Sequence, residues 1–246
     1  MRIAAFIAHP DYAVLFFGGT IIKHAQRGDE VFVVAMSPGE VGAAFKHPTK
    51  SIDELAEIKT RELEAAARVQ GVKEVRVLRF PDTRIANTPE LRATIIDLIR
   101  ELKPDVVITH WPQDGHPDVR GTAQAVVDAC FFAYLPAIKT AQPAHQVKKL
   151  YAFAETAGSE GFDPDFFVDI SDVVDVKIEA ARCNEAMVEE ISELFSKGDD
   201  DPDAWANIFL GSNMHWGQES GVRYAEPFKE LKIHGLGRRA LDALPG

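Results

Sequence analysis

Short apolar segments alternate with stretches of helical spacing along the first half of the chain, and this alternation constrains the fold most strongly. Residues 2–8 and 31–35 are largely apolar runs, which is typical of strands buried on both faces of a parallel sheet. Between them, residues 18–24 lead to Gly28, a residue type that commonly ends helices. This strand–helix–strand order predicts an α/β fold: a Rossmann-like open parallel sheet with helices on both faces.

The alternation continues further along the sequence. We predict helices over residues 51–69, where Ser51 and Glu54 can form a capping box, and over residues 89–102. Further strands are predicted at residues 75–78, 105–109, 151–154 and 166–170, and one long helix at 173–195. We expect residues 1–246 to form a single domain, with a more irregular C-terminal part from about residue 151.

Composition narrows the classes of partner. The formal net charge of -11 disfavours nucleic acid, because phosphate binding requires clustered Lys and Arg. No apolar run approaches the roughly 20 residues that a membrane span needs, so no membrane partner is expected. Only Cys130 and Cys183 are present and the N-terminus carries no export signal, which favours a cytoplasmic protein. A small-molecule substrate or ligand is therefore the expected partner.

Two similar tetrapeptides follow the first and fourth predicted strands. They are His9-Pro10-Asp11-Tyr12 and His116-Pro117-Asp118-Val119. Ligands of open α/β sheets bind beyond the carboxyl ends of the strands, so both motifs are expected at one crevice. Imidazoles and carboxylates there suit a metal site or a general acid/base pair. The alternative is that each motif only begins a helix, with the Asp accepting helix N–H groups.

These motifs resemble those of a known family. Ala8-His9-Pro10-Asp11 followed by Gly18-Gly19-Thr20, and later His116-Pro117-Asp118, are similar to the two signatures of the LmbE/PIG-L zinc-dependent N-deacetylases. The resemblance implies an LmbE-like fold and a zinc-activated water that attacks an amide carbonyl, typically the N-acetyl group of an amino sugar. It also implies that His9 is a zinc ligand, Asp11 the catalytic base, and His116 an acid or oxyanion partner. By resemblance, the protein is expected to form a homo-oligomer.

Two positions depart from the family pattern. Tyr12 stands where the resemblance places a zinc-binding Asp, and Val119 where it places a zinc-binding His. A neutral phenol is a poor ligand and Val119 has no donor, so we expect no cofactor in the ancestral position and a degenerate zinc site. Zinc or another divalent metal at an altered site stays open, with His9, Asp11 and His116 as ligands. His110, Asp114 and Asp118 lie in the neighbouring loop, although Asp118 could instead cap the following helix.

Four further residues are candidate substrate contacts: Arg61, Asp82, Trp111 and His215. Arg61 suits a carboxylate, phosphate or sugar hydroxyl, or else forms a helix ion pair. Asp82 resembles a sugar-hydroxyl acceptor but also fits an ordinary turn, Trp111 could stack on a sugar or fill the core, and His215 lies in a Gly-flanked loop that could form a lid.

We therefore expect a protein of deacetylase ancestry that lacks ordinary zinc-dependent N-deacetylase activity. It would bind or convert a small polar molecule of the sugar or carboxylate type, and one hypothesis is a non-catalytic binding or assembly protein. Two enzymatic alternatives stay open. One is an active N-acetyl-sugar or amide deacetylase, and the other is a hydratase of unsaturated polycarboxylates, which one branch of the family resembles.

Overall fold

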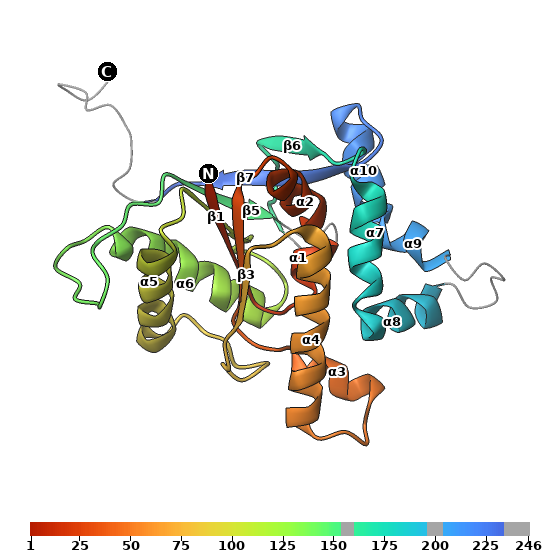
Figure 1. The fold of residues 1–246 in the computed structure, drawn as a ribbon, viewed down its shortest axis with the longest axis horizontal. Coiled ribbons are helices and arrows are strands. Elements are labelled where there is room, and N and C mark those ends of the chain that lie inside the picture. The colour runs from red at the N-terminus through yellow and green to blue at the C-terminus, as the bar shows by residue number, and fades with distance from the viewer. Residues whose placement is uncertain (154–159, 196–203, 234–246) are drawn as a thin grey trace.

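A computed structural model describes residues 1–153, 160–195 and 204–233 of the chain. Its described residues form one seven-stranded sheet (Figure 1). The strands are β1 (Arg2–Ile7), β2 (Glu30–Ala35), β3 (Glu74–Val77), β4 (Val106–His110), β5 (Lys149–Phe153), β6 (Phe166–Asp169) and β7 (Ala225–Leu231).

Helices connect most of the strands. In chain order they are α1 (Tyr12–Leu15), α2 (Gly18–Gln26), α3 (Glu40–Lys46), α4 (Ile52–Gln70), α5 (Pro89–Leu102), α6 (Pro117–Ala133), α7 (Val174–Arg182), α8 (Glu185–Phe195), α9 (Ala204–Phe209) and α10 (Gly211–Ser220). The capping box predicted at Ser51 and Glu54 is present at the start of α4. In the part of the chain that the structure describes, no helix is long and apolar enough to cross a membrane.

The strand order is β3-β2-β1-β4-β5-β7-β6. β1 to β5 pair in parallel, whereas β7 runs antiparallel to both β5 and β6. The order reverses between β1 and β4, where one connection turns toward β2 and the other toward β5. The predicted open α/β sheet is confirmed, with the refinement that its last two strands make it mixed.

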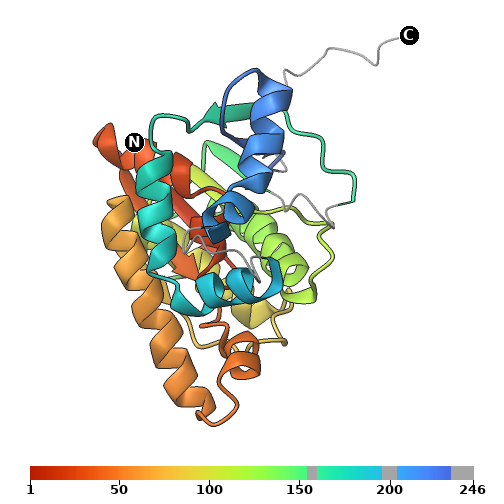
Figure 2. The same ribbon diagram turned by 90° about the vertical axis from the view of Figure 1, so that its right-hand side faces the viewer.

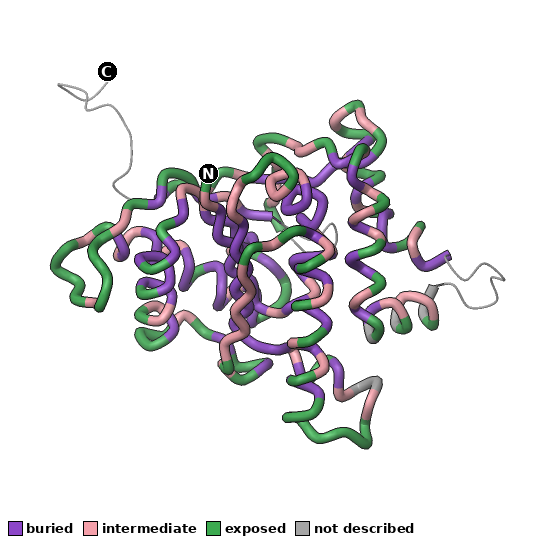
Figure 3. Tube along the Cα trace, viewed as in Figure 1, coloured by how far each residue is buried: buried purple, intermediate pink, exposed green. Residues whose placement is uncertain are grey.

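Helices cover both faces of this sheet. α5 and α6 pack against each other and against β1, while α2, α4 and α7 lie together on the opposite side (Figures 1 and 2). β1 is buried along almost its whole length, and Figure 3 shows the buried strands as a continuous purple centre between more exposed helices. This burial explains why the strands appear in the sequence as apolar runs without alternation.

Three elements of the C-terminal part differ from the sequence-based expectation. The single long helix predicted at 173–195 is wrong, because α7 ends at Arg182 and α8 leaves it at a steep angle (Figure 2). Asn184 lies at this break and its carbonyl accepts the N–H of Val188, so a new helix starts there. The region around His215 is helix α10 and not a loop, and β7 was not predicted.

Candidate metal centre

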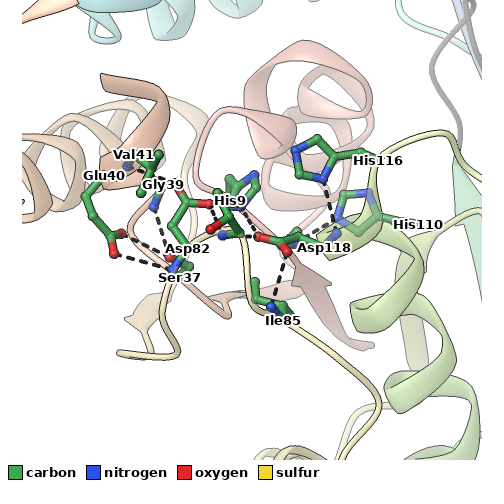
Figure 4. Close-up of polar contacts among 12 residues, drawn as sticks. His9, Ser37, Gly39, Glu40, Val41, Asp82, Ile85, His110, His116 and Asp118 are labelled. Carbon is green, nitrogen blue, oxygen red and sulfur yellow. Dashed lines mark hydrogen bonds and ion pairs between the residues drawn. The ribbon is translucent and has the colours of Figure 1, made fainter. Parts of the chain in front are cut away.

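His9 lies just beyond the carboxyl end of β1, where the strand order reverses. Its Nε2 is 2.9 Å from Oδ1 of Asp82 and 3.2 Å from Oδ2 of Asp118 (Figure 4). The parallel pairing of β1 with β2 and β4 fixes the position from which this imidazole projects. One imidazole nitrogen therefore faces two carboxylates, one from the loop after β3 and one from the first turn of α6.

Asp82 belongs to the loop that follows β3. Its Oδ2 accepts the N–H of Val41 at 2.9 Å, at the start of α3, and its Oδ1 accepts the N–H of the next residue, Thr83, at 2.7 Å. Thr83 has a φ of 68°, a left-handed conformation that is costly for a β-branched residue. The same Thr83 N–H also donates to Oδ2 of Asp118 at 2.7 Å. This strained residue thus connects the two carboxylates through one shared donor.

Asp118 lies in the first turn of α6 and is fully buried. In addition to the Thr83 N–H, its carboxylate accepts the N–H of Ile85 at 3.2 Å through Oδ1. α6 can approach this loop because residue 121 is glycine, and a Cβ there would lie 2.3 Å from the carbonyl oxygen of Ile85. The Asp118 carboxylate therefore holds the loop and faces His9, and it does not cap its own helix.

The cluster is strongly coupled electrostatically. Burial disfavours the charged imidazole, but hydrogen bonds to Asp118 and Asp82 and the negative charges of Asp11 and Asp82 outweigh it and raise the pKa of His9 to about 10. Burial also disfavours ionised Asp82, yet His9 and the backbone N–H groups hold the pKa of that carboxyl below its usual range. The proton of His9 thus lies between two carboxylates, where a divalent cation could take its place.

The donor set fits a divalent metal ion. His9, Asp82 and Asp118 each offer one ligand atom, and these atoms lie within 4.8 Å of one another. An imidazole nitrogen with carboxylate oxygens is a common donor set for zinc, iron and manganese. Each carboxylate is also oriented by backbone N–H groups, as second-shell partners orient metal ligands.

The two predicted catalytic residues flank this centre. Asp11 is half-buried and precedes α1, its side chain accepts no capping hydrogen bond from that helix, and its charge raises the pKa of His9. His116 is exposed, and its ring centroid lies 5.3 Å from that of His9. Its Nδ1 accepts the N–H of Asp118 at 3.2 Å, so in the neutral ring the proton is on Nε2. Neither the Asp11 nor the Asp118 side chain caps its helix, which contradicts the alternative that both motifs only begin helices through their Asp. The side chain that does cap a helix is His116, the N-cap of α6.

His110 is the last residue of β4, Tyr12 is the first residue of α1, and Val119 lies in the first turn of α6. His110 is buried, and its Nε2 accepts the N–H of Ala8 at 2.8 Å. Burial, followed by the charges of His9 and His116, lowers the pKa of His110 well below its usual value, so it stays neutral. The Tyr12 ring packs edge-on against His110 with centroids 4.5 Å apart, and Val119 is buried in the core.

Three of the four candidate substrate contacts, Arg61, Trp111 and His215, are not part of the three-residue cluster. Arg61 is exposed on α4 and lines a cavity of about 490 Å³ between α4 and α8. Trp111 is buried, with its indole N–H donating to the carbonyl of Glu160 at 2.9 Å. His215 is exposed on α10 beside Trp216. Of the four, only Asp82 shares a contact with His9.

Comparison with known proteins identifies the family. A family model described as PIG-L, GlcNAc-PI de-N-acetylase, matches residues 4–130, a span that contains His9, Asp82 and Asp118. This chain belongs to the PIG-L family.

Its PIG-L relatives are deacetylases by name. The chain is 32% identical to the diacetylchitobiose deacetylase of Thermococcus kodakarensis over 89% of its own length and 78% of that protein. It is 31% identical to a probable N-acetyl-alpha-D-glucosaminyl L-malate deacetylase of Bacillus anthracis, over 72% of this chain and 76% of that one.

Solved structures are also similar to this chain. The N,N'-diacetylchitobiose deacetylase of Pyrococcus horikoshii, complexed with its inhibitor MPG, superposes with a TM-score of 0.78 at 28% identity, covering 94% of this chain and 83% of that one. The hydratase GalB of Pseudomonas putida KT2440 has a TM-score of 0.76 over the full length of both chains. At 22% identity, that likeness shows the fold alone.

The expectation of a degenerate zinc site is therefore wrong. It rested on Tyr12 and Val119, which supply no ligand, but Asp82 and Asp118 bring two carboxylates to His9 instead. The deacetylase names of the relatives also contradict the expected loss of deacetylase activity. Sequence reasoning assigned Asp82 to substrate and Asp118 to a cap or an altered site. The FPD segment was a signal for Asp82, but nothing in the sequence places it against Asp118.

Proposed function

We propose that this protein is a metal-dependent deacetylase that removes the acetyl group from a small N-acetylated sugar. The single observation that carries the proposal is the His9–Asp82–Asp118 cluster, whose three ligand atoms converge at the carboxyl edge of a PIG-L sheet. The named activities of the diacetylchitobiose and glucosaminyl-malate deacetylases support the acetylated amino sugar as the substrate class.

His9, Asp82 and Asp118 would hold the cation. A divalent cation so placed would polarise the amide carbonyl and make a water molecule more acidic. Backbone N–H groups of Val41, Thr83 and Ile85 already orient both carboxylates, so little reorganisation is needed to receive the ion.

Asp11 would accept the proton of the attacking water. Its carboxylate is partly accessible and makes no capping bond that would compete for it. His116 would interact with the carbonyl oxygen of the substrate amide. Because the Asp118 N–H occupies Nδ1, the neutral ring presents Nε2–H as a donor toward the developing oxyanion. The neutral His110 supports this arrangement by accepting the N–H of Ala8, directly before His9.

Acetate release from N-acetylglucosamine and diacetylchitobiose tests the proposal. Protein stripped with a chelator should be inactive and should regain activity when a divalent cation is restored. Asp11→Asn should keep cation affinity but lower kcat by about 10²–10⁴-fold, the range for a removed general base. Asp82→Asn should instead lower cation affinity. A cation-loaded protein that releases no acetate from any N-acetylated sugar of a broad panel would contradict the proposal.

A further inference from the structure

We propose that a buried network of Gln70, Lys177 and Glu226 positions Asp11 by holding helix α1. The inference rests on the proposed function, because Asp11 is the base of that reaction. It goes beyond the proposed function by giving a role in the rate to three side chains that come from α4, α7 and β7.

Asp11 is joined to the start of α1 through its main chain. Its carbonyl oxygen accepts the N–H of Val14 at 3.0 Å and the N–H of Leu15 at 2.9 Å. α1 contains four residues, and a helix of about one turn has little stability of its own. The position of Asp11 therefore depends on the contacts that hold α1 in place.

Two buried side chains hold α1 by its carbonyl groups, which a helix leaves without intrahelical partners at its C-terminal end. From the last turn of α4, Gln70 Nε2 donates to the carbonyl of Ala13 at 3.0 Å. From α7, Lys177 Nζ donates to the carbonyl of Leu15 at 2.9 Å. α7 packs against both α1 and α4 (Figure 1), so the short helix is bound to two longer neighbours.

Lys177 is itself held by two further hydrogen bonds. Its Nζ donates to Oδ1 of Asn213 at 2.9 Å and to Oε1 of Glu226 at 2.7 Å, so the ammonium uses all three of its donors. Glu226 in turn accepts the N–H of Gly19 at 2.9 Å and of Thr20 at 2.7 Å, in the first turn of α2. The cation thus faces the C-terminal end of α1 and the carboxylate faces the N-terminal end of α2, which is the favourable order for both helix ends.

The junction between α1 and α2 packs closely against this network. Residue 18 is glycine, and a Cβ there would lie 2.8 Å from Gln70 Nε2 and 3.1 Å from the Ala13 carbonyl oxygen. The network and the close junction together define one position for α1. A misplacement of about 1 Å at a reacting group can lower a rate by about 10²-fold, so loss of the network should slow the chemical step.

Two variants of the full chain test the inference. Lys177→Met combined with Glu226→Gln removes both buried charges together with the donor to the Leu15 carbonyl. Gln70→Met removes the donor to the Ala13 carbonyl at nearly the same side-chain volume. Each should lower kcat for acetate release by about 10–100-fold, with KM and zinc affinity nearly unchanged. Gln70→Met buries no charge, so it decides if the double variant does not fold, and an unchanged kcat in it would overturn the inference.

A second comparison shows whether the loss acts through Asp11. Residues that act as a unit give non-additive losses, so adding Gln70→Met to Asp11→Asn should lower kcat by less than about twofold further. A further loss of about tenfold or more, as independent sites give, would contradict a positioning role.

Hydrogen exchange gives a readout that does not depend on catalysis. The N–H groups of Val14 and Leu15, which donate to Asp11, should exchange at least about tenfold faster in both variants than in the wild type, because local opening of α1 becomes easier. Unchanged exchange at these two groups would refute the network's hold on α1. A wild-type protein that releases no acetate would refute the proposed function, and the exchange rates would still decide whether the network holds α1.

Leu150→Ala is the matched control. Leu150 is fully buried near the start of β5, at the opposite edge of the sheet from His9, and loss of its side chain lowers the free energy of unfolding. It should leave kcat and the exchange of Val14 and Leu15 close to their wild-type values. If it lowers kcat as much as Gln70→Met does at an equal loss of stability in urea, the network is merely structural and the inference is wrong.

Discussion

At the scale of single residues, Thr83 has the most demanding position in the molecule. Its N–H is shared between Asp82 and Asp118, and its φ of 68° is left-handed. Only two non-glycine residues in the described chain have a positive φ, and Thr83 is the one beside the metal centre. Backbone strain of this kind costs on the order of 1–3 kcal/mol and persists where the surroundings enforce it.

Substitution of Thr83 tests whether the strain serves the site. Thr83→Gly keeps the N–H and removes the steric penalty. The free energy of unfolding of the metal-free protein should therefore rise by about 1 kcal/mol, while cation affinity stays nearly constant. Thr83→Pro removes the N–H and cannot adopt this φ, so cation affinity should fall by at least about tenfold. Urea denaturation and manganese titration measure the two effects. Equal cation affinities in both variants would contradict the shared-donor role.

His9 links cation binding to pH. The pKa of its imidazole in the metal-free fold, about 10, exceeds the ordinary value of 6.5, so its protonation stabilises that fold below about pH 6.5. This stabilisation is lost as the pH rises through about 10. At pH 7.5 a bound cation must displace that proton.

Isothermal titration calorimetry in buffers of different ionisation enthalpy counts the displaced proton. We expect close to one proton released per cation at pH 7.5, and cation affinity that rises with pH between 7 and 9. His9 is not a ligand if the cation affinity does not change with pH over this range and the heat of binding does not depend on the buffer.

The sequence predicted His9, Asp11 and His116 as site residues, because their motifs follow the first and fourth predicted strands and resemble the two family signatures. It did not identify the pairing of Asp82 with Asp118. That pairing depends on the conformation of Thr83 and on the approach of α6 to the loop at Ile85, both of which are tertiary features. A comparison of single positions with a family motif detects missing donors, but not other carboxylates that the fold brings to the same imidazole.

At the scale of elements, the placement of α6 controls the centre. Gly121 lets the helix touch the loop backbone, with Ile85 O only 2.3 Å from where a Cβ would be. Gly121→Ala should therefore push α6 from the loop, lower the free energy of unfolding by about 1–3 kcal/mol, and weaken cation binding by at least about tenfold. Thermal unfolding and manganese titration measure these changes.

Gly42 provides the matched control on α3. A Cβ there meets nothing within 4 Å, so Gly42→Ala should raise the free energy of unfolding by about 0.5–1 kcal/mol through its higher helix propensity. Cation affinity should not change. Unaltered cation binding in Gly121→Ala would show that the Asp118 position does not depend on this close approach.

Elements with strong local signals were predictable, and those that depend on their neighbours were not. The capping box of α4 and the apolar runs of β1 and β2 are local patterns. β7 contains Glu226, Pro227 and Lys229, a composition that does not predict a strand. It pairs antiparallel with two strands that are distant in sequence, so no local pattern indicates its position in the sheet. The break between α7 and α8 likewise follows from the packing around Asn184.

At the scale of the whole molecule, one buried ion pair connects distant elements. Lys177 of α7 and Glu226 of β7 are fully buried and lie 2.7 Å apart. Lys177 also donates to the side chain of Asn213 on α10, while Glu226 accepts the N–H groups of Gly19 and Thr20 at the start of α2. The Gly-Gly-Thr segment of the first signature is therefore bound by a carboxylate from near the end of the chain.

Breaking this pair should affect the entire fold. Lys177→Met leaves Glu226 buried without its cation and should lower the free energy of unfolding by about 3–5 kcal/mol. Adding Glu226→Gln removes the unpaired charge, so the double variant should lose less than the sum of the two single variants. Lys149→Met, in the exposed pair with Glu230, should change stability little. Additive losses in urea denaturation would contradict a coupled pair.

The three side chains of the metal centre come from positions 9, 82 and 118. During synthesis, a chain that has not yet exposed residue 118 to solvent contains at most two of them, and the first ligand is made long before the last. A cation held by all three side chains would therefore bind only after the amino end of α6 has docked. Supplementing the growth medium should change the metal loading of finished protein, but it should not rescue variants that fail before that stage of folding.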